Sequence, residues 1–329
     1  KDSNKRATID TGLVIKKAIL GIAGSNVRSM HCWDSIQKVE GIAAVTATDL
    51  NNGIESSKIT SNQDWQTLHV IPRTYSLDGT RGIRNPLGMH ADELKMEVTK
   101  IIGNPEQIGR LEDVVDMSGT KALAVIATPI CTAEAVLTSD ECEDGVILMD
   151  IGGGTTDISV FHEGSVIYTS SVPVGGNHFT NDLSIAFSIG PDEAERLKIE
   201  KGTCVPEITP ISEEITLNPI NLPDPIVLTR REIGQVLKDR AEELLRMSLL
   251  RLDVDLLKDL PIERVVFTGG AAKMEGFLQL ANYMLQRKTR LGKPRGVEKL
   301  PEFNIDPSYA SAVGLTIWGI NNLSLEGCV

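Results

Sequence analysis

The sequence feature that most constrains the fold of this chain is the stretch Gly145–Val160, which reads GVILMDIGGGTTDISV. In this stretch an apolar run leads into Asp150, a segment of glycines and threonines follows, and Asp157 opens a second apolar run. Apolar runs on both sides of a short glycine-rich segment are typical of two strands joined by a tight turn. The sequence therefore predicts a strand that ends near Asp150, a turn, and a second strand that begins near Asp157.

The chemistry of this turn suits a nucleotide phosphate and its metal. Glycine has no Cβ, so the backbone can approach a ligand closely, and successive N–H groups can converge on one anion. A carboxylate at the end of a buried strand suits Mg²⁺, which takes few protein carboxylates and keeps several waters. We therefore expect Asp150 to hold Mg²⁺ through water, although the glycines alone would also fit a hairpin that only turns the chain. The residues expected at the phosphates are Gly152, Gly153, Gly154, Thr155 and Thr156.

Three further segments resemble sites where a backbone meets a ligand. Gly175 and Gly176 precede an expected helix, and a helix N-terminus offers free N–H groups and the positive end of its dipole. The run RVVFTGGAA at 264–272 predicts a strand that ends in a glycine pair, where a flat ring or a ribose could come close. Asp10-Thr11-Gly12 looks like a small phosphate loop, but the residues before it form a poor strand, so an ordinary segment is the alternative.

Composition excludes several classes of protein. The chain has 329 residues, 41% of them hydrophobic, which is ordinary for a globular protein with two domains or one large domain with subdomains. The net charge of −12 disfavours a grip on nucleic acid, which needs basic patches. The sequence has no run of about 18 apolar residues that could span a membrane, and no signal peptide is visible. The five cysteines lack metal-ligand spacing and indicate a reduced, cytosolic chain.

The rest of the chain alternates between strand and helix patterns, which indicates an α/β protein. Pro72 is expected to stop a strand, and Thr229 with Glu232 forms a capping box before a long helix. Isolated His69 and His90 receive no role. The expected strands are 18–25, 68–71, 94–102, 122–127, 165–174 and 264–272. The expected helices are 107–117, 129–137, 178–187, 191–201, 229–256, 274–285 and 308–319.

These motifs resemble those of the actin, Hsp70 and sugar-kinase superfamily. Val146–Phe161 is similar to its second phosphate motif and Val265–Ala271 to its adenosine motif. The helical stretch Asp192–Gly202, with Glu195 and Lys198, resembles the helix that touches the ribose and base. Within the superfamily the resemblance narrows to the bacterial cell-division family FtsA. The stretches that carry it are Ile22–Met30, Leu68–Met89, Cys131–Glu141, Val172–Phe187 and Ser308–Leu315.

The resemblance implies an α/β, actin-like (ribonuclease H-like) fold with two lobes, an FtsA-type extra subdomain and an incomplete first lobe. Most of residues 18–320 take part in it. The implied divisions are 1–17 as a remnant of the first lobe, 18–105 as the extra subdomain, 106–142 as a first-lobe segment, 143–190 as the base of the second lobe, 191–256 as its tip, 257–300 as the base again, and 301–329 as the closing helix of the first lobe with the tail.

Three departures from the family pattern accompany the resemblance. The chain begins at Lys1 and lacks the family's first phosphate motif, so we expect an N-terminally truncated product. The family's C-terminal amphipathic membrane helix, which needs basic residues and a large apolar face, is also expected to be missing. Thr128 stands where the superfamily often has the Gln or Glu that orients the attacking water. Hydrolysis is therefore expected to be weak or absent, and whether the chain is an enzyme stays open.

The function that the resemblance implies is that of an ATP-binding scaffold of cell division, in which the nucleotide acts as a conformational clamp. Such a scaffold polymerises and links FtsZ filaments to the membrane and the divisome at the septum. The implied cofactors are ATP and Mg. Beyond the turn, Gly175 and Gly176 would support the phosphates, and Glu195 and Lys198 would meet the ribose. The implied adenine contacts are Gly269, Gly270 and Ala271.

The implied partners are the FtsZ C-terminal peptide at the tip subdomain, further copies of the chain in filaments, and other divisome proteins at the extra subdomain. The implied location is cytoplasmic, at the inner face of the cell membrane, with the membrane reached only through a segment absent here. One alternative is a superfamily ATPase or kinase, but no catalytic Asp is seen in a suitable context. The other is a PilM-type pilus-assembly protein, over which the stretch Leu68–Met89 favours FtsA.

Overall fold

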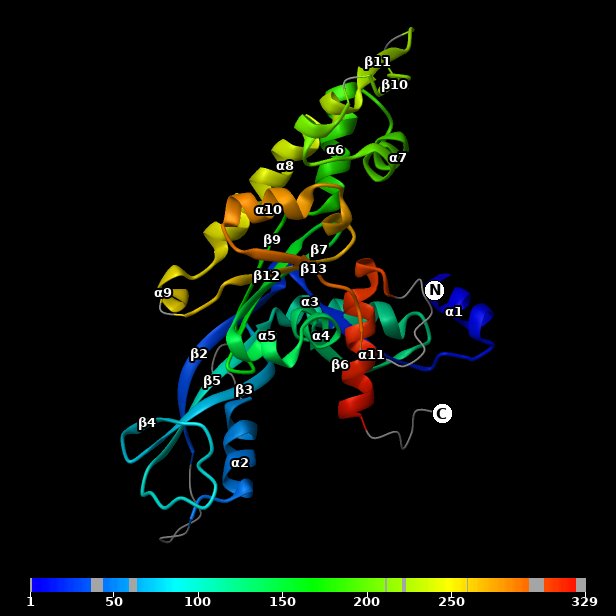
Figure 1. The fold of residues 1–329 in the computed structure, drawn as a ribbon. Helices are drawn as coiled ribbons and strands as arrows, with labels where there is room; N and C mark the ends of the chain where they lie inside the picture. Colours follow the sequence, from blue (N-terminus) through cyan, green and yellow to red (C-terminus); the bar gives the residue numbers. More distant parts are fainter. Residues whose placement is uncertain are drawn as a thin grey trace.

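The computed structural model describes residues 2–36, 44–58, 64–210, 212–220, 223–258, 260–295 and 305–323. The molecule is elongated (Figure 1): a small hairpin forms one end, and a four-stranded sheet with one helix forms the other. A five-stranded sheet and its helices lie between them. In the described part of the chain, no helix has the length and apolar character that crossing a bilayer requires.

The five-stranded sheet contains the glycine-rich turn. Its strand order is β13-β12-β7-β8-β9, and β12 runs parallel to both β7 and β13. The strand, turn and strand predicted at 145–160 are confirmed, because β7 and β8 pair antiparallel on either side of the glycines. Asp150 lies opposite Thr268 on one side and Asp157 on the other. The strands are β7 (Val146–Ile151), β8 (Thr156–His162), β9 (Ser165–Val172), β12 (Arg264–Thr268) and β13 (Lys288–Leu291).

One face of this sheet packs against the helices of the upper half in Figure 1. The core there is apolar, with the rings of Phe267 and Phe277 in edge-to-face contact at 5.3 Å between centroids. Thr229 and Glu232 form the predicted capping box, but the long helix ends at Arg251 because Leu252 is already extended. The elements are α6 (Gly176–Phe187), α7 (Pro191–Lys201), η2 (Pro206–Ile208), β10 (Glu214–Leu217), β11 (Ile226–Thr229), α8 (Arg230–Arg251), α9 (Val254–Leu257), η3 (Ala271–Lys273) and α10 (Phe277–Leu285).

The other face of the sheet packs against two crossing helices, α4 and α11. They approach so closely that a Cβ at Gly314 would lie 1.9 Å from the carbonyl oxygen of Cys131. Beyond them, β1 and β6 form a two-stranded parallel sheet. The elements are α1 (Asp2–Thr11), β1 (Lys17–Ile22), α3 (Pro105–Asp116), β6 (Lys121–Ala127), α4 (Thr128–Val136), α5 (Ser139–Asp144), η5 (Pro307–Tyr309) and α11 (Ala310–Asn322).

The four-stranded sheet is antiparallel, in the order β2-β5-β3-β4, and has its own apolar core. The two-residue turn between β3 and β4 has Asp78 at φ 48° and Gly79 at φ 84°. The sheet and its helices comprise η1 (Gly24–Asn26), β2 (Val27–Ile36), α2 (Ala47–Ser57), β3 (Gln66–Leu77), β4 (Thr80–Ile83) and β5 (Leu94–Gly103).

Two predictions about local structure are wrong. Pro72 does not stop its strand, since β3 continues to Leu77. The pairing of β3 with β5 shifts register between Pro72 and Thr74, and such an irregularity accommodates a residue that cannot donate to the ladder. Asp10-Thr11-Gly12 is not a phosphate loop, because Asp10 and Thr11 are the last residues of α1 and no strand precedes them.

Candidate functional site

Three glycine-containing segments line one cleft with a volume of about 730 Å³. They are the turn between β7 and β8, the start of α6, and the segment that follows β12. Because β7 and β12 are parallel neighbours, the segments that follow them lie at the same edge of the sheet. The cleft therefore brings together motifs that lie more than 100 residues apart in the sequence, as Gly153 and Gly269 do.

Most of the site residues expected from the sequence line this cleft. Gly154, Thr156 and Gly175 do not. Thr156 is fully buried and its hydroxyl donates to the Val174 carbonyl oxygen at 2.8 Å. A Cβ at Gly175 would lie 2.6 Å from the carbonyl oxygen of Gly152, so this glycine permits α6 to pack on the turn. The expected residues that line the cleft are Asp150, Gly152, Gly153, Thr155, Gly176, Glu195, Lys198, Gly269, Gly270 and Ala271.

The start of α6 does not offer the free N–H groups expected there, which corrects that part of the prediction. The N–H of Gly176 donates to the Gly152 carbonyl at 2.8 Å, and the N–H of Asn177 donates to that of Gly153 at 2.7 Å. The N–H of Gly175 donates to the His178 ring at 3.1 Å. This end of α6 therefore holds the turn in place instead of presenting these donors to an anion.

The turn itself retains donors. The N–H of Gly152 closes the turn on the Thr155 carbonyl at 2.9 Å. Within the described ranges, the N–H groups of Gly153, Gly154 and Thr155 donate to no other protein atom. Consecutive unbonded N–H groups in a turn can form a small anion-binding concavity.

Two carboxylates lie beside the turn, the half-buried Asp150 and the buried Asp157. Asp150 Oδ2 accepts hydrogen bonds from Ser311 at 2.8 Å and Thr132 at 3.3 Å, and burial raises its pKa. Asp157 accepts the Gly24 N–H at 2.9 Å, and burial raises its pKa to about 6. A cation bound in the cleft beside these carboxylates would stabilise both of them, because a nearby positive charge favours the ionised form.

Gly269 is the glycine on which this arrangement depends most. Its φ is 87°, and a Cβ would lie 2.3 Å from the Ile151 carbonyl oxygen and 2.6 Å from Asp150 Oδ1. No other residue type fits these contacts without a shift of the backbone. The segment after β12 therefore approaches the end of β7 as closely as two backbones can.

The charged pair on α7 joins this helix to α6 at the cleft wall. Lys198 Nζ donates to the Gly176 carbonyl at 3.0 Å, to Thr180 at 2.8 Å and to Glu195 at 2.7 Å. Burial would raise the pKa of Glu195, but the hydrogen bonds from Lys198 and Thr180 outweigh it and lower that pKa. Glu195 thus stays ionised beside the cleft.

Sequence reasoning missed the residues at the far end of the cleft. Arg230, the first residue of α8, donates to the Lys201 carbonyl at 2.9 Å and to Glu275 at 2.6 Å. Its place directly after the capping residue Thr229 was visible, but the partners were not. Thr128, the position expected to matter for hydrolysis, does line the cleft. Other lining residues without a prediction are Ala23, Asn177, Ile199, Glu200, Gly202, Lys273, Met274, Ser308 and Ser311.

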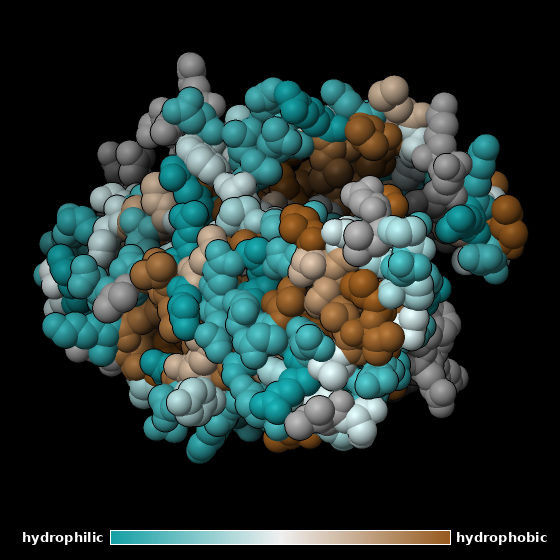
Figure 2. Space-filling model, turned by 90° about the horizontal axis from the view of Figure 1, so that it is seen from above, coloured by the Kyte–Doolittle hydropathy of each residue, from teal (hydrophilic) through white to brown (hydrophobic). Residues whose placement is uncertain are grey.

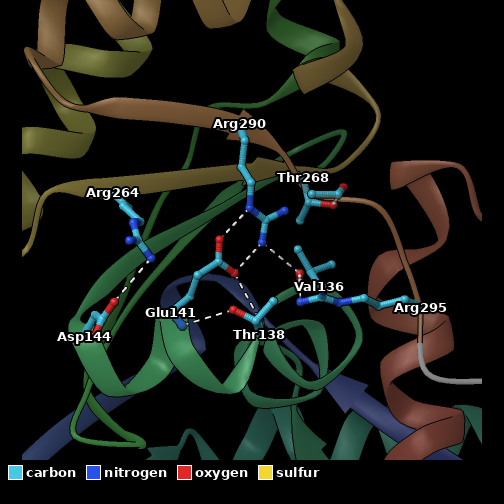
Figure 3. Close-up of polar contacts among 9 residues, drawn as sticks. Val136, Thr138, Glu141, Asp144, Arg264, Thr268, Arg290 and Arg295 are labelled. Carbon is cyan, nitrogen blue, oxygen red and sulfur yellow. Dashed lines mark hydrogen bonds and ion pairs between the residues drawn. The ribbon is translucent and has the colours of Figure 1, made fainter.

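A polar cluster behind the cleft joins the edge strand β13 to the helices on the other face of the sheet (Figure 3). Arg290 donates twice to Glu141, at 2.6 Å and 2.5 Å, and also to the Val136 carbonyl at 3.0 Å. Glu141 is at the same time the capping-box residue of α5, paired with Thr138. Arg295 donates to the Val136 carbonyl as well, at 3.1 Å. The C-terminal end of α4 is therefore held to β13.

Known structures identify the class of fold. The chain is similar to MreB5 of Spiroplasma citri bound to ADP, with a TM-score of 0.51 and 20% identity over 66% of each chain. It is also similar to a chain of the PilM–PilN type IV pilus biogenesis complex, with a TM-score of 0.64 and 13% identity over 97% of this chain and 84% of the other. The fold is thus actin-like, as the sequence predicted.

Comparison with protein families is more specific. The family model "Cell division protein FtsA" matches residues 147–314, and the model of the SHS2 domain inserted in FtsA matches residues 24–102. The FtsA of Agrobacterium fabrum is 33% identical over 93% of this chain and 70% of its own length. The FtsA of Escherichia coli K12 is 31% identical over 93% and 74%. The chain belongs to the FtsA family of cell-division proteins, and the PilM-type alternative is the weaker one.

Proposed function

We propose that this chain is a cell-division scaffold that binds ATP in the cleft between the β7–β8 turn and the segment after β12. One observation carries the proposal: Gly153 and Thr155, whose N–H groups donate to no atom of the described residues, line the same cleft as the carboxylates of Asp150 and Asp157. Polyphosphate and Mg²⁺ together would satisfy both features, because phosphate oxygens accept the N–H groups and the metal compensates the carboxylates. The MreB5 structure named above is bound to ADP, which agrees with this proposal.

In this proposal Asp150 holds Mg²⁺ through water, and Asp157 lies near enough to share that role. The metal would supply charge neutralisation at the phosphates when bound. Gly175 and Gly176 support the phosphates indirectly, by fixing the turn. Glu195 and Lys198 meet the ribose, and the residues at the adenine are Gly269, Gly270 and Ala271.

The nucleotide acts as a conformational clamp more than as a substrate. Thr128 lies at the cleft, where a Gln or Glu would be needed to orient an attacking water. A threonine hydroxyl is too short and too weakly basic to replace them, so we propose that hydrolysis is slow or absent.

Partners follow from membership in the family and from the arrangement of the parts. The tip, residues 191–256, would receive the C-terminal peptide of FtsZ. Residues 18–105, which contain the four-stranded sheet, would contact further copies in filaments and other divisome proteins. We propose a site of action at the inner face of the cell membrane, which the protein would reach through a segment other than those described.

The test is magnesium-dependent ATP binding by calorimetry, with Asp150→Asn as the variant and Lys58→Gln as the control. Lys58 is exposed and lies on the four-stranded-sheet side, far from the cleft lining. We expect heat of binding for the unchanged chain and the control, and an affinity at least about tenfold weaker for Asp150→Asn, since a metal-linked carboxylate is lost. ATP binding that is equal in all three chains would contradict the proposed site.

A further inference from the structure

His69 lies outside the cleft, but its side chain accepts a hydrogen bond from Ala127, the residue before the cleft-lining Thr128. The residue is on β3, where the register against β5 shifts between Thr67 and His69. Such bulges often re-aim a side chain. The His69 ring crosses to the neighbouring β6, where its Nε2 accepts the N–H of Ala127 at 3.1 Å.

The tautomer of His69 follows from this hydrogen bond. An Nε2 that accepts must carry no proton, so the neutral ring has its proton on Nδ1. Burial lowers the pKa of His69 to about 4, which keeps the ring neutral and the acceptor available at neutral pH.

Ala127 is the residue at which β6 becomes α4. It is fully buried, with φ −65° and ψ 116°, and α4 begins at the next residue. That residue, Thr128, lines the cleft. Thr132 follows one helical turn later on the same face of α4 and donates to Asp150 Oδ2 at 3.3 Å. The position of Ala127 thus determines where two threonines meet the cleft and its carboxylate.

We propose that His69 is a positioning residue that couples the four-stranded sheet to the cleft. It holds Ala127, and through the first turn of α4 it sets Thr128 and the Thr132–Asp150 contact. A partner that shifts the four-stranded sheet would then change the affinity of the cleft for its ligand. A ligand in the cleft would change the affinity of the sheet for that partner by the same free energy. The part of this inference that concerns ligand affinity rests on the proposed ATP site.

The first test is amide hydrogen exchange in the whole chain. His69→Phe removes the acceptor and keeps a flat ring, whereas His69→Gln restores an acceptor near the position of Nε2. The matched control is Thr67→Val on the same strand, whose hydroxyl is buried and has no hydrogen-bond partner among the described residues. We expect Ala127 and the first turn of α4 to exchange about five- to tenfold faster in His69→Phe, as the loss of one buried hydrogen bond implies. His69→Gln and Thr67→Val should exchange like the unchanged chain.

The second test is the affinity of the same four chains for a fluorescent ATP analogue with Mg²⁺. We expect the affinity for the analogue to be about threefold or more weaker in His69→Phe and to recover in His69→Gln. Glutamine restores the hydrogen-bond acceptor, whereas a loss caused only by the changed shape of the side chain would persist. If the Phe variant does not fold by circular dichroism, His69→Ala takes its place in both tests.

The outcomes separate the two proposals. Unchanged exchange at Ala127 in His69→Phe would overturn the role of His69. Faster exchange with unchanged affinity would also overturn the coupling. If the unchanged chain binds no analogue, the proposed ATP site fails, and exchange in the first turn of α4 alone then decides whether His69 positions that helix.

Discussion

At the scale of single residues, this cleft depends on backbone geometry and on buried charge. Glycines occur where two backbones approach to within the width of a methyl group, as at Gly269 and Gly175. Carboxylates occur where burial makes ionisation costly, as at Asp150 and Asp157. The glycines let the segments pack closely, and the cost of ionising the two carboxylates would be offset by a bound cation.

The first residue-scale prediction concerns the close approach at Gly269. Gly269→Ala should destabilise the protein by about 2–4 kcal/mol, because the added Cβ meets backbone atoms at a positive φ. Gly154→Ala is the matched control, since nothing lies within 4 Å of a Cβ there. Its effect should stay below about 0.5 kcal/mol. Urea unfolding followed by circular dichroism measures the stability of both variants. Equal losses of stability would contradict the close backbone contacts at Gly269.

The second residue-scale prediction concerns pH. The folded-state pKa of Asp157 is raised to about 6, so between about pH 4 and 6 the folded chain binds more protons than the unfolded chain. This carboxyl therefore makes the protein less stable as pH rises through that window, and the loss persists above it. Asp157→Asn should remove this slope. The stability of the variant minus that of the unchanged chain should therefore be about 1–3 kcal/mol larger at pH 7 than at pH 4.

The measurement is the free energy of unfolding of both chains at several pH values. Because His69 titrates in both chains, the difference between the chains reports Asp157 together with its charge coupling to Asp150. A difference that is constant from pH 4 to 7 would contradict the raised pKa. Added Mg²⁺ should narrow the difference at pH 7 if the carboxylate faces a metal site.

At the scale of elements, α4 joins three parts of the molecule: the four-stranded sheet, the cleft and the edge strand β13. Its first turn is held to β3 through His69 and Ala127, its middle contacts Asp150, and its last carbonyl is held by Arg290 and Arg295. The close crossing with α11 leaves little freedom for α4 to move alone. A shift of this helix should therefore move the cleft and the edge strand β13 together.

The element-scale prediction concerns the Arg290–Glu141 pair of Figure 3. Arg290→Leu should cost about 2–4 kcal/mol of stability, because the Glu141 carboxylate stays buried, with a side chain 10% exposed, and loses its partner. Arg264→Leu is the control, since Arg264 and Asp144 are 43% and 62% exposed and 3.5 Å apart. Its effect should be below about 0.5 kcal/mol.

Thermal or urea unfolding of the two variants gives the comparison. Adding Glu141→Gln to Arg290→Leu should recover part of the loss, since no charge is then buried alone. A double variant that is worse than the sum of its parts would contradict this account of the pair.

At the scale of the whole molecule, the cleft lies between the two ends that are proposed to meet partners. The tip hairpin extends away from the five-stranded sheet on one side, and the four-stranded sheet extends away on the other (Figure 1). Seen from the tip, hydrophilic residues are interspersed with separate groups of apolar residues (Figure 2). An arrangement with a ligand site between two outlying bodies suits a protein whose ligand sets the relation of its binding surfaces.

The whole-molecule prediction concerns the tip. A labelled peptide with the C-terminal sequence of FtsZ should bind this chain with micromolar affinity in a fluorescence polarisation assay, and a scrambled peptide should not. The Arg290→Leu variant, which is altered at a side chain hydrogen-bonded to Glu141 and Val136 and outside residues 191–256, should bind the peptide equally well wherever it remains folded. Absence of binding by a folded, unchanged chain would contradict the assignment of the tip.

The sequence alone determined much of the local structure of this protein, and most of the site residues that it predicted line the cleft. Apolar runs around the glycines predicted β7 and β8, and Thr229 with Glu232 predicted the start of α8, because these signals depend on neighbours a few residues apart. Only the tertiary structure decided which N–H groups stay free, since those of Gly176 and Asn177 are taken by the turn. It also decided that Asp157 meets Gly24 and that His69 meets Ala127, contacts between residues 133 and 58 positions apart. Such contacts depend on how whole elements pack, and no local pattern encodes them.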